Sequence, residues 1–189
     1  MLDQRIQGLY GITPNNNLNI ALIERVFNKH KVNVLQYRHK SNNDELKLEE
    51  AKQLLELCLQ HNTLFIVNDD INLCEKVGAD GVHLGQKDID IETARSQLGE
   101  KFIIGVSCYN NPQLAIEAEK KGANYVAFGI IFPSTTKPSA GYCPLSTIES
   151  VKQKINIPIV GIGGINFDNQ KYVFEAGCDS VAMVSGLFS

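Results

Sequence analysis

Two aspartates could hold a divalent metal ion. Asp69 and Asp88 each come just after a short apolar run, and if those runs are neighbouring parallel strands, the two carboxylates meet at one edge. Two carboxylates with few other protein ligands suit Mg²⁺, which completes its coordination with water and substrate phosphate oxygens. An alternative stays open, in which Asp69 or Asp70 caps a helix that begins near Ile71 and Asp88 is a turn residue.

Three cations could bind a diphosphate. Arg38 and Lys40 are two residues apart in an extended segment and therefore project to the same side, and Lys137 lies in a long loop after another apolar run. Three cations together with Mg²⁺ match a pyrophosphate better than a neutral ligand. Taken singly, each of them is more often a solvated surface charge.

Hydroxyl side chains lie in that same long loop. Ser134, Thr135 and Thr136 stand between Pro133 and Pro138, in a segment too long to be a simple connection. We interpret it as a loop that closes over a bound substrate.

Glycines follow the last two apolar runs. Gly163 and Gly164 come after one, and Val184-Ser185-Gly186 ends the other. A phosphate is commonly bound by backbone N–H groups at these two places in a barrel, because glycine lets the backbone approach an anion closely. Alone, Gly163 and Gly164 are as well explained by a tight turn, but their pairing with the second segment favours phosphate.

These residues are separated by a regular alternation of expected strands and helices. Short runs rich in Val, Ile and Phe predict eight strands, namely Gly8–Ile12, Val32–Gln36, Leu64–Val67, Gly81–Leu84, Phe102–Ser107, Tyr125–Phe128, Pro158–Ile162 and Ser180–Val184. The expected helices are clearest at Asp44–His61 and Pro112–Lys121, the second capped by Asn110 or Asn111. Several helices should end at a glycine, as in Gly78, Gly122 and Gly177.

Eight parallel strands with connecting helices predict an α/β fold, a compact (β/α)8 TIM barrel that forms a single domain over residues 1–189. An open doubly wound sheet is the alternative, but no G-x-G-x-x-G follows the first strand. The final helix should be very short or missing, because almost no sequence follows Val184. Either a partner, such as a second copy in a homo-oligomer, covers that flank or the helix is vestigial.

Composition narrows the function classes. The chain has 189 residues, 43% of them hydrophobic, which is typical of one soluble globular domain. The chain has 18 Lys plus Arg against 21 Asp plus Glu, and these charges are scattered along the sequence. We therefore do not expect nucleic acid to be a partner. No apolar run is long enough for a membrane span or a secretory signal, so we expect no membrane association and a cytoplasmic protein.

Cysteine and histidine give weaker signals. The five cysteines include no C-x-x-C pair, so we expect reduced thiols that mostly pack in the core, Cys108 among them. His83 falls inside an expected strand and is interpreted as a hydrogen-bonded residue of the core or barrel lining rather than a ligand.

Seven segments, in this order and spacing, resemble thiamine phosphate synthase (thiamine-phosphate pyrophosphorylase), and the resemblance covers nearly the whole chain. They are Gln36-Tyr37-Arg38-His39-Lys40, Val67-Asn68-Asp69, 81–88, Gly105-Val106-Ser107, 128–138, Gly163-Gly164-Ile165 and Val184-Ser185. The resemblance implies a magnesium-dependent transferase of thiamine biosynthesis. It joins the diphosphate of hydroxymethylpyrimidine to thiazole phosphate and releases pyrophosphate.

The resemblance also implies roles for individual residues. Mg²⁺ would be held by Asp69 and Asp88, and the catalytic residues would be Arg38, Lys40, Ser107 and Lys137. The pyrimidine diphosphate would be bound by Gln36, Tyr37, Arg38, His39, Lys40, Asn68, Ser107 and Lys137. The thiazole phosphate would be bound by Ser134, Thr135, Thr136, Gly164, Val184 and Ser185.

Two rivals remain open. A thiazole tautomerase resembles the same family but relies on a histidine near Ser107, where this chain has none up to Asn110. A non-catalytic barrel that binds a phosphorylated metabolite would need only the glycines. The chain also departs from the family's usual first motif, since Tyr37 and His39 replace its Leu and Glu.

Overall fold

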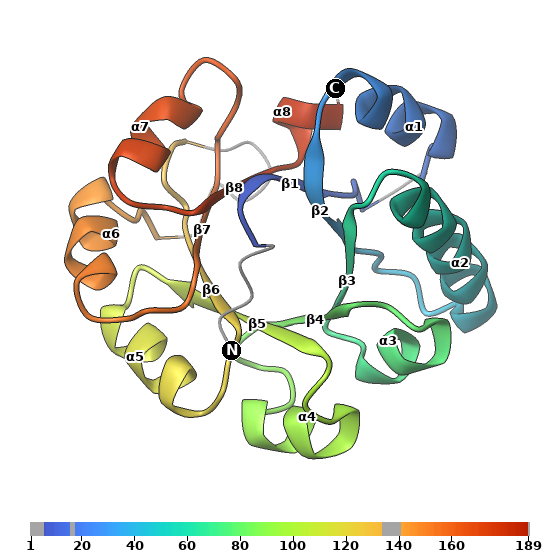
Figure 1. The fold of residues 1–189 in the computed structure, drawn as a ribbon, viewed down its shortest axis with the longest axis horizontal. Coiled ribbons are helices and arrows are strands. Elements are labelled where there is room, and N and C mark those ends of the chain that lie inside the picture. Colours follow the sequence, from blue (N-terminus) through green and yellow to red (C-terminus); the bar gives the residue numbers. More distant parts are fainter. Residues whose placement is uncertain (1–5, 16–17, 134–140, 189) are drawn as a thin grey trace.

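Eight parallel strands close into a barrel, each followed by a helix (Figure 1). The computed structural model describes residues 6–15, 18–133 and 141–188. The strands are β1 Gly8–Ile12, β2 Val32–Tyr37, β3 Leu64–Asn68, β4 Gly81–Leu84, β5 Ile103–Tyr109, β6 Tyr125–Phe128, β7 Ile159–Ile162 and β8 Ser180–Met183. The helices are α1 Ile20–Lys29, α2 Asp44–Gln60, α3 Ile71–Val77, α4 Ile91–Leu98, α5 Pro112–Lys120, α6 Leu145–Lys152, α7 Gln170–Glu175 and α8 Ser185–Phe188.

The barrel closes where β1 pairs with β8, with Gly8 opposite Ser180 and Gly11 opposite Met183. This confirms the predicted (β/α)8 fold and excludes the open sheet. The eight expected strands all form, and their ends lie within two residues of the predicted ones.

Alternate residues of each strand face two separate apolar layers. On β1, Tyr10 and Ile12 point into the barrel and Leu9 points outward to the helices. On β2, Val34 belongs to the inner layer, whereas Leu35 and Tyr37 belong to the outer one. This period of two decides which polar residues can reach the centre of the barrel.

Polar caps fix where the helices begin and end. The side chains of Asn43, Asp70 and Asn111 accept hydrogen bonds from backbone N–H groups in the first turns of α2, α3 and α5. Gly78 ends α3 in the left-handed conformation at φ 74°. These signals are readable in the sequence, which is why the helix limits are predicted well.

The last helix is only four residues long, as expected from the sequence. It lies between α7 and α1 in Figure 1, where Leu187 and Phe188 are buried. A Cβ atom at Gly11 would be 3.2 Å from either of these side chains, so α8 packs closely on the outer side of β1.

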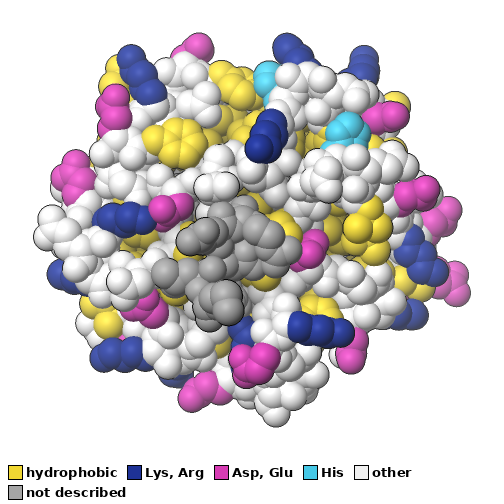
Figure 2. All heavy atoms as spheres, viewed as in Figure 1, with side chains coloured by type: hydrophobic (Ala, Val, Ile, Leu, Met, Phe, Trp, Pro, Cys, Tyr) yellow, Lys and Arg dark blue, Asp and Glu magenta, His cyan; other side chains and the backbone are white. Residues whose placement is uncertain are grey.

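Charged side chains of both signs lie on the surface. On the face in Figure 2, Lys and Arg side chains are interspersed with Asp and Glu around the edge instead of gathering by sign. Among the described residues no helix is long and apolar enough to cross a membrane.

Candidate active site

A cavity of about 730 Å³ lies over the carboxyl ends of the strands. Parallel strands all present their carboxyl ends to one mouth, which is where barrel enzymes place their sites. The predicted site residues that line it are Gln36, Arg38, Asn68, Ser107, Gly164, Val184 and Ser185.

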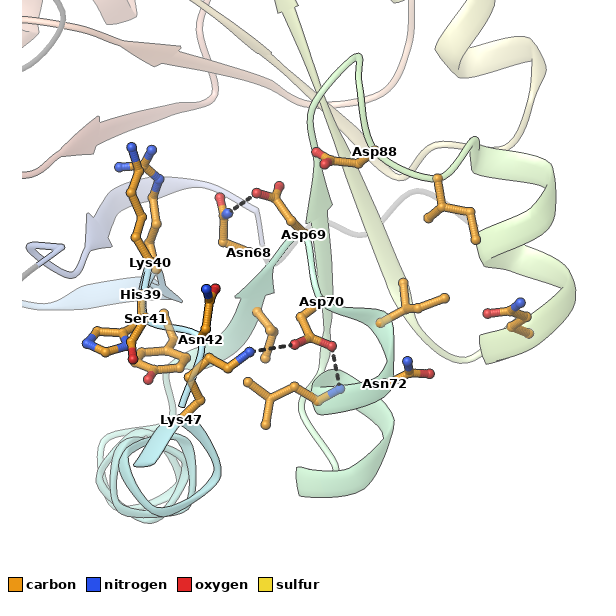
Figure 3. A pocket seen from close by; sticks show the side chains of 17 residues that line it. His39, Lys40, Ser41, Asn42, Lys47, Asn68, Asp69, Asp70, Asn72 and Asp88 are labelled. Carbon is orange, nitrogen blue, oxygen red and sulfur yellow. Dashed lines mark hydrogen bonds and ion pairs between the residues drawn. The ribbon is translucent and has the colours of Figure 1, made fainter. Parts of the chain in front are cut away.

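A second pocket, of about 830 Å³, is drawn in Figure 3. It adjoins the first, because Arg38 and Asn68 line both. Of the predicted residues, it is also lined by Tyr37, His39, Lys40, Asp69 and Asp88. The two pockets therefore bring together every predicted site residue within the described ranges. The other predicted site residues lie outside the described ranges, namely Ser134, Thr135, Thr136 and Lys137.

The carboxylates of Asp69 and Asp88 interact with each other. The pKa of Asp69 is raised to about 6, first by burial and then by the hydrogen bond and negative charge of Asp88, while Asn68 and Arg38 act in the opposite direction. In Figure 3 the Asp88 carboxylate points toward Asp69, which is hydrogen-bonded to Asn68. Two carboxylates that repel at neutral pH form a site suited to a cation.

The backbone explains this arrangement. Asp69 has a φ of 63°, and its N–H donates to the His83 carbonyl at 2.8 Å. Asp70, not Asp69, caps α3. Asp88 Oδ2 accepts the N–H of Gly85 at 2.7 Å, so Asp88 also closes the turn after β4. The capping alternative therefore applies to Asp70 and leaves Asp69 in the pocket.

The donor set fits magnesium better than a structural metal. In the described part of the chain, no three His, Cys, Asp or Glu side chains are grouped as metal ligands. A cation between two carboxylates would take its other ligands from water and phosphate oxygens, as Mg²⁺ does.

Arg38 is held at the junction of the pockets. Its Nη1 donates to Asn15 Oδ1 at 2.7 Å, and its backbone N–H donates to the Thr13 hydroxyl at 2.9 Å. Lys40 is exposed on the rim. By contrast, Lys47 is paired with Asp44 at 2.7 Å and Asp70 at 3.4 Å, so its charge is partly neutralised.

Tyr37 and His39 fall on the other side of the same segment. The Tyr37 hydroxyl donates to Glu50 Oε2 at 2.6 Å, and the two rings stack with centroids 6.1 Å apart. Burial raises the pKa of Tyr37 well above its ordinary value. Both side chains pack toward α2, and a role for them in substrate binding stays a prediction.

The glycine segments leave room for backbone alone. Gly164 has a φ of 62°, and a Cβ there would lie 2.4 Å from the Pro133 carbonyl oxygen. A Cβ at Gly186 would lie 2.5 Å from the Ile165 carbonyl oxygen. These loops therefore form tight turns and also present backbone to the cavity.

A buried polar network that was not predicted lies under the cavity. Gln36 Nε2 donates to the Tyr10 hydroxyl at 2.8 Å, and the Tyr10 and Tyr125 hydroxyls are 2.8 Å apart. His83 contacts Tyr125 through Nδ1 and Ser107 Oγ through Nε2, both at 2.9 Å. His83 is thus a hydrogen-bonded residue of the barrel lining, as its sequence position indicated.

Gly105 makes room for this network. A Cβ at residue 105 would lie only 1.9 Å from Cζ of Tyr125, so the phenol occupies the space of the missing side chain. Cys108 is not part of the network, because its Sγ donates to the Val106 carbonyl at 3.8 Å, and burial raises the pKa of its thiol to about 12. It packs, as expected.

Known proteins match the chain along almost its whole length. The profile of the family described as thiamine monophosphate synthase matches residues 9–187. The thiamine-phosphate synthase of Thioalkalivibrio sulfidiphilus is 44% identical over 98% of this chain and 90% of its own length. That of Nitrosomonas eutropha is also 44% identical, over 98% of this chain and 88% of its own.

Solved structures agree. A thiamine phosphate pyrophosphorylase from Pyrococcus furiosus superposes with a TM-score of 0.87 at 33% identity, covering 96% of this chain and 87% of that one. An N-acetylmannosamine-6-phosphate 2-epimerase from Clostridium perfringens, at 12% identity and a TM-score of 0.70 over 96% of this chain and 87% of that one, shares the fold alone. The chain therefore belongs to the thiamine monophosphate synthase family.

Proposed function

We propose that the chain is a Mg²⁺-dependent thiamine-phosphate synthase that joins the diphosphate of hydroxymethylpyrimidine to thiazole phosphate. The products are thiamine phosphate and pyrophosphate. Its relatives at 44% identity carry that name, and the transferase activity in thiamine biosynthesis is that of the family. The finer assignment is supported by the two adjoining pockets, one lined by cations and carboxylates and the other by aromatic side chains and glycine backbone.

The residues divide between two anions. Arg38 and Lys40 lie where they would bind the diphosphate, and we assign Lys137 to the same group. The backbone at Gly164, Val184 and Ser185 would bind the thiazole phosphate at the opposite rim, with the hydroxyls of Ser134, Thr135 and Thr136. Separate sites are needed, because two phosphorylated substrates must be bound at once.

The proposed reaction breaks the C–O bond between the pyrimidine methylene and the diphosphate and forms a C–N bond to the thiazole nitrogen. The electron-rich aminopyrimidine shares the positive charge left on the methylene, so no protein nucleophile is required. Arg38, Lys40 and Lys137 stabilise the negative charge that grows on the departing pyrophosphate. Asp69 and Asp88 would hold Mg²⁺, which when bound neutralises part of that charge.

Two observations disfavour the rivals. A tautomerase has no diphosphate to expel, whereas this site keeps the cations and the carboxylate pair. The stretch from Ser107 to Asn110, near which a tautomerase histidine is expected, contains no histidine, and its Tyr109 lines the cavity. A module that only binds phosphate would need neither the cations nor the carboxylate pair.

The decisive assay incubates the protein with both substrates, with Mg²⁺ or with EDTA, and measures thiamine phosphate. Product should form only with the metal, and Asp69→Asn and Asp88→Asn should each lose most activity, whereas Glu100→Gln, an exposed carboxylate elsewhere, should not. Equal rates in EDTA and Mg²⁺ would exclude the metal assignment. No product under any condition would exclude the synthase. We also expect the enzyme to work in the cytoplasm and to be able to form a homo-oligomer, which light scattering would measure.

A further inference from the structure

The buried network joins two side chains that both face the substrate cavity. Gln36 is at one end and Ser107 at the other, and three residues from different strands link them. The linking residues, Tyr10, Tyr125 and His83, are at most 8% exposed. In such a chain of hydrogen bonds each O–H must donate to an acceptor, because a buried O–H without one is costly in free energy.

The Gln36 amide, whose Nε2 faces the Tyr10 hydroxyl, sets the direction at the first link. A phenol carries one hydrogen and can accept up to two. Burial raises the pKa of Tyr10 and of Tyr125 above the ordinary value, so both keep their hydrogens at neutral pH. Tyr10 accepts from Gln36, and Tyr125 is its one other hydrogen-bond partner in the described part of the chain. Tyr10 must therefore donate to Tyr125.

The same argument determines which group donates in each of the remaining hydrogen bonds. Having accepted from Tyr10, Tyr125 must donate its own hydrogen to Nδ1 of His83, 2.9 Å away. An accepting Nδ1 places the imidazole hydrogen on Nε2, which then donates to Ser107 Oγ at 2.9 Å. The Ser107 hydroxyl, having accepted, keeps its hydrogen for a group in the cavity.

The other end has the opposite polarity. Gln36 uses Nε2 to donate to Tyr10, and within residues 6–15, 18–133 and 141–188 its Oε1 has no hydrogen bond. Since Gln36 lines the cavity, this oxygen can accept from a ligand. One side of the site thus offers an acceptor and the other a donor.

We propose that Tyr10, Tyr125 and His83 are positioning residues that order these hydrogen bonds, so that the site selects an aminopyrimidine. An amino group can donate to Gln36 Oε1, and a ring nitrogen can accept from Ser107. The deaminated 4-oxo analogue places a carbonyl where the amino group was, which faces the Gln36 oxygen unfavourably. The inference rests on the proposed function, because it assigns the pyrimidine to this cavity.

The first experiment measures the hydrogen position directly. ¹⁵N-labelled histidine in the unaltered protein gives signals from four histidines, and His83→Asn identifies the one of interest. We expect the Nε2–H form for His83 without substrate. The Nδ1–H form would mean that the hydrogen bonds run in the opposite direction, and it would overturn the proposal. This readout does not depend on catalysis, so it stays informative even if no thiamine phosphate is made.

The second experiment tests selectivity. The ratio of kcat/KM for the 4-amino substrate to that for the 4-oxo analogue is measured in Tyr10→Phe and Tyr125→Phe. Each variant should lower the ratio roughly tenfold, the loss expected for one ordered hydrogen bond. Tyr172→Phe, which removes an exposed hydroxyl on α7, is the matched control and should leave it unchanged. An unchanged ratio in both network variants, with activity retained, would reduce the network to a structural role and refute the proposal.

Discussion

The repulsion between Asp69 and Asp88 should make the metal-free protein less stable than a variant without it. In Asp88→Asn the second negative charge is gone, and the amide oxygen can still accept the N–H of Gly85, which Asp88 Oδ2 accepts at 2.7 Å. We expect this variant to lose activity and to gain stability at neutral pH when no metal is bound.

The size of the gain follows from the pKa of Asp69, which is raised from 3.8 to about 6. This difference is worth about 3 kcal/mol. Burial is the largest single cause, so only part of the difference belongs to Asp88, and solvent screens a residue that is exposed at the pocket surface. We therefore expect a gain of about 1 kcal/mol, or roughly 2–4 °C in Tm for a chain of this size.

The pH dependence has a definite sign. A carboxyl group whose pKa is raised in the folded state binds more protons when folded than when unfolded, so its contribution to stability falls as pH rises from about 4 to about 6. The gain in Asp88→Asn should accordingly be small near pH 5 and full near pH 8.

Thermal unfolding in EDTA at several pH values measures this. Asp90→Asn is the control, because hydrogen bonds to Thr93 lower the pKa of that exposed carboxyl and its loss should not stabilise. Adding Mg²⁺ should raise the Tm of the unaltered protein far more than that of Asp88→Asn. If Asp88→Asn is no more stable than the unaltered protein at pH 8, the two carboxylates do not repel and the reasoning fails.

Two further predictions concern the substrate anions. Gly164→Asp should weaken thiazole phosphate binding far more than binding of the pyrimidine diphosphate, because φ is 62° and a Cβ would meet the Pro133 carbonyl at 2.4 Å; calorimetry that shows the reverse would overturn the division of sites. Lys137→Ala should lower kcat by roughly 10²–10³-fold and change KM less, since the Lys137 charge is expected to stabilise the departing diphosphate. Steady-state kinetics that show an unchanged kcat would exclude Lys137 from that role and favour the tautomerase alternative.

Local signals made the fold predictable. The expected strands form because most of their runs of apolar residues are bounded on at least one side by Gly, Asp or Asn, which end strands and cap helices. The first residues of α2 and α5 are as predicted, since Asn43 and Asn111 act as caps whose chemistry is local, and their last residues differ from prediction by one. Motif spacing likewise indicated the family.

The network under the cavity could not be predicted in the same way. A period of two indicates that Tyr10 and Tyr125 face inward, but these residues are 115 positions apart and only the closed barrel brings their hydroxyls within 2.8 Å. The same period did contain a usable signal for Tyr37 and His39, since residues next to Gln36 and Arg38 on an extended segment must face the other way.

The contact between Gly105 and Tyr125 makes two positions that are distant in sequence share one space. Any side chain at residue 105 would overlap the phenol ring, as its Cβ would lie 1.9 Å from Cζ. Substitution at 105 is therefore tolerable only after residue 125 has become smaller, and a smaller residue 125 no longer carries the hydroxyl that His83 contacts. During divergence, or in a randomised library, the two positions should change together or not at all. A barrel that has drifted at both should have lost its preference for an aminopyrimidine while keeping its fold.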